Sequence, residues 1–379
     1  MNGFSEEITL EGHIIDSWIL PKVFDAVMDL GGAFDVTEFR VGTKKDEPSF
    51  ARMKISAETQ EQLDRILTAL QDYGAVMVSK NDVHAITVTQ DGVVPDDFYS
   101  TTNLPTQVRI NNQWVDVTGT EMDLVIVVDR AQASAEMIPM ADVHVGDPVV
   151  VGHEGIRVLP LERSRDREIL SFMQSNVSSE KPKRLVIEAI AKQMRETRAH
   201  NGKILVVAGP AIVHSGAAQY LARIIRAGYV QALFGGNAIA AHDVEGALLG
   251  TSLGVALHSG RAVEGGHRHH MAAINTIRRA GSLRAAVEQG ILREGIMYEC
   301  IRNNVEFVLA GSVRDDGPLP DVITEMGEAQ RRMRAAVKNV EMALMVSTML
   351  HSIATGNMLP ASVKTVAVDI NPAVVTKLA

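Results

Sequence analysis

The segment that decides the fold reads Ala310-Gly311-Ser312-Val313-Arg314-Asp315-Asp316-Gly317-Pro318-Leu319-Pro320-Asp321, and it follows a mostly apolar run, Val305 to Leu309. Two earlier segments, Leu205 to Gly216 and Ala232 to Asp243, repeat this order of apolar run, glycines and polar residues. Strands that end in glycine and lead into helices are typical of an open α/β sheet, which binds nucleotides at the carboxyl edge of its strands. The second half of the chain is therefore predicted to be a nucleotide-binding α/β domain.

The length, charge and cysteine content of the chain limit the kinds of protein and ligand that it can represent. A chain of 379 residues predicts more than one domain, because single cores stop growing at about 250 to 300 residues. The net charge of −9 opposes binding to nucleic acid or an anionic membrane, so a small polar ligand is expected. One cysteine, Cys300, excludes an intramolecular disulfide and a multi-cysteine zinc site. With Glu6 and Glu7 where a signal peptide would be basic, a cytoplasmic protein is predicted.

Three regions are expected along the chain. Residues 1–85 should form a ferredoxin-like α+β domain, because the patterns follow in the order strand, helix, two strands, helix, strand. Residues 86–175 indicate a small β-rich subdomain, since short apolar runs alternate with Asn, Gly and Asp turns. Residues 184–379 should form a Rossmann-like α/β domain, in which near-continuous apolar strands are covered on both faces.

The sulfur-containing residues of the second half are expected in the core. Met342, Met345, Met349 and Met358 lie in or near a predicted long carboxy-terminal helix, and core positions are favoured over a methionine-rich partner surface. Cys300 has no base beside it in the sequence, so a buried, inert thiol is predicted.

Candidate cofactor contacts follow the predicted strand ends. Backbone N–H groups there could bind a phosphate at the start of a helix. For the segment Gly209 to Gly216, a plain tight turn is the alternative. The standard G-x-G-x-x-G fingerprint is absent. The residues assigned to cofactor binding are Gly209, Pro210, Ala211, His214, Gly235, Gly236, Asn237, Ala238, Gly311, Ser312, Asp369 and Asn371.

Three of these positions carry side chains with a specific predicted use. The amide of Asn237 can both donate and accept, which suits a carboxamide, a ribose or an amino acid head group. Asp369, at a strand tip, could bind ribose hydroxyls. Asn371 precedes a proline and is equally consistent with an ordinary helix start.

The acid–base candidates are Asp315 and Asp316 beside Arg314. A carboxylate close to a bound ammonium can orient it and accept its proton, which amine oxidation by hydride transfer requires. A surface ion pair between arginine and aspartate is the alternative. Glu264 and His267, in a polar glycine-rich segment, are candidate ligand contacts or proton handlers, unless that loop is simply solvated.

A metal site is not predicted. Four histidines fall between His258 and His270, but among arginines and glycines and at no spacing that converges on one zinc ion.

With these residues assembled, the chain resembles the family that shares a conserved region with lysine-ketoglutarate reductase/saccharopine dehydrogenase (LOR/SDH). It is most similar to the archaeal-type ornithine cyclodeaminases and the carboxy-terminal part of the cyanobacterial arginine dihydrolase fusion enzymes. The resemblance rests on the runs Phe98 to Asn103, Pro105 to Arg109, Gly295 to Cys300, Ala310 to Asp321 and Val368 to Leu378. It implies the deoxyhypusine-synthase-like variant of the NAD-binding fold, which accounts for the missing fingerprint.

The resemblance also implies an activity. A member of this family would convert L-ornithine to L-proline and ammonia with tightly held NAD that is regenerated in each turnover, and a homo-oligomer, dimer or tetramer, would be expected. Asp315 or Asp316 would then handle the proton, and Asn237 would orient the substrate. Arg109 and Asn103 would bind substrate from the β-rich region, so the site would form at a domain or subunit interface. An exposed strand residue is the alternative for Arg109.

Other functions stay open at this point. A saccharopine-type NAD-dependent amino acid oxidoreductase would release NADH from the same pocket. A transferase like deoxyhypusine synthase normally needs an active lysine, and no lysine after Lys192 stands in a glycine-rich loop. A non-catalytic sensor of NAD or amino acids would bind its ligand without turnover.

Overall fold

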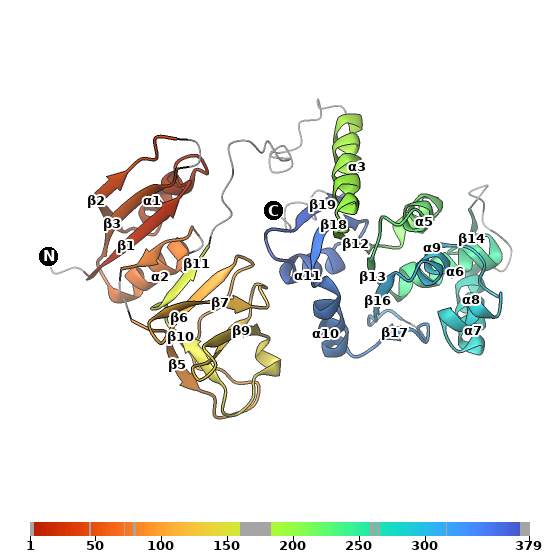
Figure 1. Ribbon diagram of the computed structural model, residues 1–379. Helices are drawn as coiled ribbons and strands as arrows, with labels where there is room; N and C mark the ends of the chain where they lie inside the picture. The colour runs from red at the N-terminus through yellow and green to blue at the C-terminus, as the bar shows by residue number, and fades with distance from the viewer. Residues whose placement is uncertain are drawn as a thin grey trace. The chain divides into compact units, whose positions relative to one another are not determined.

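The protein divides into two compact units. A computed structural model describes residues 4–44, 47–71, 73–78, 81–159, 183–257, 261, 263, 266–315 and 317–371 (Figure 1). The first unit comprises Met1–Asn176 with Leu359–Ser362, and the second comprises Val177–Met358 with Val363–Ala379. Among the described residues, no helix is long and apolar enough to cross a membrane.

The first unit begins with a four-stranded antiparallel sheet in the order β2-β3-β1-β4. Helices α1 and α2 pack on it, and the apolar stripe of α2, with Leu63, Ile66 and Leu70, is buried against Ile8 and Leu10 of β1. This element and strand order confirms the predicted ferredoxin-like arrangement. The elements are β1 (Phe4–Gly12), α1 (Ile19–Asp29), β2 (Ala33–Arg40), β3 (Ser49–Ala57), α2 (Gln60–Gln71) and β4 (Val76–Met77).

A seven-stranded sheet, in the order β11-β6-β7-β9-β8-β10-β5, completes the first unit. Its core contains Val108, Ile110 and Ile126, and in β6 the buried residues alternate with more exposed ones, as expected of a strand with one buried face. The β-rich character predicted from the turn-rich sequence is confirmed. The elements are β5 (His84–Thr87), β6 (Thr106–Ile110), β7 (Gln113–Thr118), β8 (Val125–Asp129), β9 (Ser134–Ile138), the 3-10 helix η1 (Met140–Asp142), β10 (Pro148–Val151) and β11 (Ile156–Val158).

The second unit contains a six-stranded parallel sheet in the order β17-β16-β13-β12-β18-β19. The chain enters at β12, proceeds outward to β17, and then returns to the other side of β12 with β18 and β19. The strand order therefore reverses between β12 and β18, as in doubly wound nucleotide-binding folds. The strands are β12 (Lys203–Ala208), β13 (Ala232–Gly236), β16 (Glu306–Ala310), β17 (Val322–Ile323), β18 (Val340–Val346) and β19 (Lys364–Val368), with a separate hairpin of β14 (Thr251–Ser252) and β15 (Val255–Ala256).

Helices cover both faces of this parallel sheet. Figure 1 shows α10 and α11 on one side of β13 and β16, and α5, α6 and α9 on the other. Because both faces are covered, Ile204 to Val207 of β12 are at most 2% exposed. The helices are α3 (Lys183–Ala199), α4 (Ala211–His214), α5 (Ala218–Arg226), α6 (Asn237–Leu249), the 3-10 helix η3 (Gly266–Arg268), α7 (His269–Ala280), α8 (Leu283–Glu288), α9 (Ile296–Arg302), α10 (Met326–Val337) and α11 (Leu350–Met358).

The predicted long carboxy-terminal helix is wrong. Met342 and Met345 lie in β18, a central strand, and the helix α11 begins after Met349 and includes Met358. A central strand is apolar on both faces, so its sequence lacks the two-residue alternation that identifies a strand, and methionine does not distinguish strand from helix. The predicted burial holds for Met342, Met345 and Met358, whereas Met349 is 45% exposed.

Candidate functional site

A cavity of about 610 Å³ lies at the carboxyl edge of the parallel sheet. Its walls come from the segments that follow β12, β13, β16 and β18, so it lies where the strand order reverses. Ligands of open α/β sheets bind in this crevice. Some of the residues predicted as cofactor contacts line this cavity, namely Gly209, Pro210, His214, Gly236, Asn237, Ala238 and Ser312.

Gly209 permits a close approach of two loops at this edge. Its N–H donates to the carbonyl of Val346 at 2.9 Å, and a Cβ at this position would collide with the carbonyl of Ser347. The segments after β12 and β18 therefore meet without a side chain of residue 209 between them, and Gly209 itself lines the cavity.

The helix that follows Gly209 is short. Helix α4 is one turn, and the chain then turns at Gly216, where φ is +74°, before α5 begins. The stronger helix dipole belongs to α6, which starts at Asn237 directly after β13 and has no side-chain cap at Gly236. Its first N–H groups lie at the cavity wall formed by Gly236 to Ile239.

Asn237 is buried and links two of the cavity loops. Its Oδ1 accepts a hydrogen bond from the N–H of Leu319 at 3.0 Å, which attaches the loop after β16 to the start of α6. Because Asn237 also lines the cavity, its amide is positioned by the fold before any ligand binds.

The segment after β16 brings charged groups to the cavity. Arg314 and Asp315 both line it, and Asp315 Oδ2 accepts from the N–H of Ser312 at 2.8 Å, which fixes the carboxylate in the turn. Gly311 lies against β17, where its N–H donates to Ile323 at 2.8 Å. Asp316 lies outside the described residues.

The remaining predicted site residues are not in the described lining of the cavity. Asp369 follows the edge strand β19, and its Oδ1 accepts from the N–H of Asn371 at 2.8 Å in a local turn away from the cavity lining. Ala211 and Gly235 are also absent from the described lining. His267 lies in η3, and Glu264 lies outside the described residues.

Arg109 and Asn103 belong to the first unit. Arg109, on β6, has its Nε 4.0 Å from Asp82 Oδ1, and its Nη2 donates to Asn112 Oδ1 at 3.2 Å. Its side chain is 14% exposed, so it is not the simple exposed strand residue that was the alternative. The assignment of both residues to substrate binding stays a prediction.

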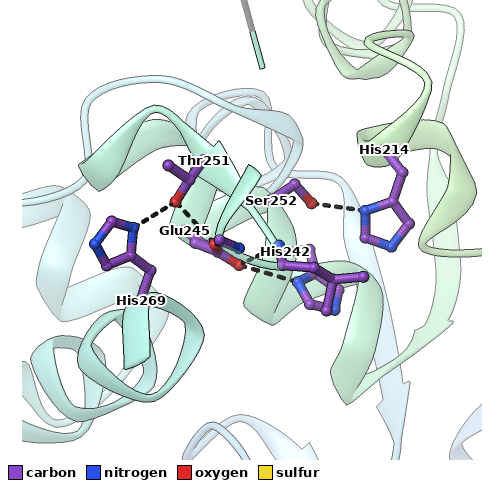
Figure 2. A network of polar contacts seen from close by, with 8 residues as sticks. His214, His242, Glu245, Thr251, Ser252 and His269 are labelled. Carbon is purple, nitrogen blue, oxygen red and sulfur yellow. Dashed lines mark hydrogen bonds and ion pairs between the residues drawn. The ribbon is translucent and has the colours of Figure 1, made fainter. Parts of the chain in front are cut away.

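A buried polar network adjoins the cavity, and the site predictions did not include it. Figure 2 shows the Glu245 carboxylate between Thr251 and His242, with hydrogen bonds to both. Glu245 is fully buried and also accepts from the N–H groups of Leu253, at 3.1 Å, and Gly254, at 3.0 Å. Burial acts to raise the pKa of Glu245, but its hydrogen bonds from His242, Gly254, Thr251 and Leu253 outweigh burial and lower it.

Histidines surround this end of the cavity. The ring of His214 lies 4.8 Å from that of His242, and its Nδ1 is 2.7 Å from Ser252 Oγ. Burial, and then the nearby His242, lowers the pKa of His214. In the segment after β18, burial lowers the pKa of His351, and its buried Nδ1 has no hydrogen-bond partner among the described residues. Within those residues, no group of three or more His, Cys, Asp or Glu could hold a metal ion.

Asp243, next to His242, stabilises the start of another helix. Its two carboxylate oxygens accept from the N–H groups of Ile296 and Met297, both at 2.8 Å, and so cap the start of α9. Burial raises the pKa of Asp243 to about 6. Cys300, on the same helix α9, is buried as predicted, and burial raises the pKa of its thiol.

Comparisons with known proteins identify the family. Residues 188–379 match the family described as arginine dihydrolase ArgZ-like, C-terminal, Rossmann fold, residues 105–187 match the first region of the same C-terminal part, and residues 5–104 match the LOR/SDH bifunctional enzyme conserved region. The ornithine cyclodeaminase of Methanocaldococcus jannaschii is 54% identical over 99% of this chain and 90% of its own length. The chain belongs to the ArgZ-like ornithine cyclodeaminase family. The resemblance inferred from the sequence motifs is confirmed.

Two further relatives extend the comparison. The bifunctional arginine dihydrolase/ornithine cyclodeaminase ArgZ of Synechocystis is 48% identical over 99% of this chain, which spans 54% of that enzyme's length. The crystal structure of apo ArgZ superposes on 99% of the chain with a TM-score of 0.87. The ternary complex of AgrE with ornithine and NAD+ is 46% identical over 99% of the chain, with a TM-score of 0.52. Membership of the ArgZ-like ornithine cyclodeaminase family therefore extends over both units.

Proposed function

We propose that this protein is an NAD-dependent ornithine cyclodeaminase, which converts L-ornithine to L-proline and ammonia. The observation that carries the proposal is the 54% identity, over 99% of the chain, to an archaeal protein named ornithine cyclodeaminase. Because the chain also covers 90% of that relative, the likeness extends to the whole of the fold and its cavity rather than to one shared domain.

The cavity has features that fit NAD. It lies at the reversal of strand order, Gly209 lines it, and the first residues of α6 are in its wall. His351 adds a buried Nδ1 that needs a hydrogen-bond partner. We infer that Gly209, Pro210, Gly236, Asn237, Ala238 and Ser312 would hold the cofactor. When bound, NAD would accept a hydride from the substrate and return it, so that the reaction has no net redox change.

The charged groups of the cavity match the substrate. Ornithine carries two ammonium groups and a carboxylate, and a guanidinium and a carboxylate are the groups that pair with them most strongly. We infer that Asp315 orients one ammonium group and can take up its proton, and that Arg314 pairs with the substrate carboxylate. The assignments of Asp316, Glu264, His267, Asn103 and Arg109 to the substrate, of Asp369 and Asn371 to the cofactor, and of a homo-oligomeric state are retained as predictions.

The experiment is incubation of the purified protein with L-ornithine and a catalytic amount of NAD. Proline and ammonia are expected in equal amounts, without accumulation of absorbance from NADH. Accumulation of NADH with product would instead assign a saccharopine-type oxidoreductase. Binding of NAD without turnover of L-ornithine would contradict the proposal and favour a sensor. L-lysine serves as the comparison substrate, since one methylene in a pocket changes binding by only about 1 to 3 kcal/mol.

A further inference from the structure

We propose that His242 accepts the proton of the substrate's α-ammonium group, and that Glu245 is the positioning residue that orients its imidazole. This inference rests on the proposed function, and it adds two residues to the predicted site. It is carried by the geometry of the cavity and of the buried network in Figure 2.

The position of His242 is set by helix α6. His242 and Glu245 are three residues apart, so both side chains lie on one side of the helix. The distance between His242 Nδ1 and Glu245 Oε2 is 3.1 Å. A carboxylate only accepts hydrogen bonds, so the neutral imidazole donates through Nδ1–H and carries its lone pair on Nε2.

The lone pair of His242 is available to a ligand. Among the described residues, Nε2 of His242 has no hydrogen-bond partner, while the side chain lines the cavity. The side chain of His242 is 11% exposed, so little bulk water reaches it. A base in this position acts on a group bound in the cavity.

Glu245 is held independently of His242. Thr251 Oγ1 donates to it at 2.8 Å, and two further bonds come from the backbone of Leu253 and Gly254 in the turn between β14 and β15. The carboxylate is therefore fixed in place by contacts other than the one to His242. It holds the imidazole in one orientation and one tautomer, as the carboxylate does in a catalytic triad.

The other histidines of the cavity lack this arrangement. His214 is bonded to a hydroxyl, that of Ser252, and His351 has no partner for its Nδ1. The ring of His270 lies 6.5 Å from that of His242. Within the described part of the chain, His242 is the cavity histidine that is bonded to a carboxylate.

The proton transfer balances within the proposed reaction. The α-ammonium must lose a proton before hydride leaves Cα, because the nitrogen lone pair forms the new C–N π bond. His242 Nε2 takes that proton and returns it to the nitrogen that departs as ammonia. One ornithinium cation thereby gives one proline zwitterion and one ammonium ion, so no proton or electron is consumed. An imidazole, with an ordinary pKa of roughly 6.5, is suited to transfer in both directions near neutral pH.

The first test compares H242A and H242Q with the control H200A. His200 also pairs with a glutamate, Glu341, at 2.7 Å, but that pair is at the surface and far from the cavity lining. H242A and H242Q should lower kcat by about 100-fold to 10,000-fold with KM changed less than about threefold, and added imidazole should restore part of kcat in H242A. H200A should behave as the parent, with no response to imidazole. A kcat within about threefold of the parent in H242A, or a loss without rescue by imidazole, would overturn the assignment.

The second test does not depend on turnover. With 15N-labelled histidine, the NMR signals of His242 are those present in the parent and absent in H242Q. They should show the Nδ1–H tautomer. E245Q should change that tautomer and lower kcat by at least about tenfold, while NAD binding by equilibrium dialysis is retained. An Nε2–H tautomer in the parent would overturn the inference. If the parent makes no proline, the proposed function fails, but the tautomer still tests whether His242 is oriented as a base.

Discussion

The Oδ1 of Asn237 accepts a hydrogen bond from the backbone N–H of Leu319 at 3.0 Å, and this bond joins the start of α6 to the charged loop after β16. Both groups are buried. This hydrogen bond joins the proposed cofactor contacts and the proposed substrate contacts in one continuous wall of the cavity. Damage to this bond should therefore affect both stability and turnover, and different substitutions should separate the two.

N237A removes the acceptor and leaves the Leu319 N–H unpaired. We expect the free energy of unfolding to fall by about 1 to 3 kcal/mol, and kcat/KM for ornithine to fall as well. N237D keeps an acceptor oxygen and should lose less stability than N237A, yet lose activity because the amide donor is gone. Denaturant unfolding and steady-state kinetics measure the two effects. Equal loss of stability in the two variants would contradict the role of Oδ1.

G209A introduces a Cβ where the carbonyl of Ser347 already lies. The loops after β12 and β18 must separate, so we expect about 1 to 3 kcal/mol less stability and weaker NAD binding. The control is G236A, because a Cβ there would meet its nearest atoms only at 3.5 Å. Stability of G236A close to that of the parent, with G209A clearly lower, is the expected result. NAD binding by equilibrium dialysis and thermal unfolding provide the measurements.

The buried histidines predict a pH dependence of stability. Burial lowers the pKa of His351 in the folded protein, and the same holds for His214. As pH falls below the unfolded pKa of roughly 6.5, the unfolded chain therefore binds protons first, and the stability present above that pH is progressively lost. H351Q should reduce the loss of unfolding free energy between about pH 7 and pH 5. An unchanged pH dependence in H351Q would show that His351 does not contribute.

D243A tests the buried cap of α9. The substitution leaves the N–H groups of Ile296 and Met297 without their acceptor, so we expect a loss of several kcal/mol, at about 1 to 3 kcal/mol for each group. The matched control is S282A at the cap of α8, where Ser282 accepts from the N–H of Ala285 at a more exposed site. That variant should lose only about 1 kcal/mol. A similar loss in both variants, by urea unfolding, would argue against the importance of burial.

The sequence predicted the features that depend on local pattern. Glycine after an apolar strand identified the loops at Gly209, Gly236 and Gly311. The helix α2 is predicted by apolar residues that recur every three to four positions, namely Leu63, Ile66, Leu67 and Leu70. Strand β18 was missed because a central strand has no polar alternation, so nothing in Val340 to Val346 separates it from a helix.

The His242–Glu245 pair was not predicted as a site for a different reason. Its three-residue spacing is visible in the sequence, but surface helices often carry such pairs. What distinguishes this pair is burial and the hydrogen bonds from Thr251, Leu253 and Gly254, which come from a hairpin that follows α6. Those contacts depend on tertiary structure and have no local signature.

The pairing of β18 with β12 also determines when the cavity can form during translation. One part of the cavity lining follows β12, and the part beside it, with His351, follows β18 far later in the chain. A nascent chain that has emerged only as far as β17 has no partner for the open side of β12, and its glycine loop faces water. The ligand cavity is therefore completed only after β18 has been synthesised, so a ligand that binds in it does not stabilise the shorter translation intermediates.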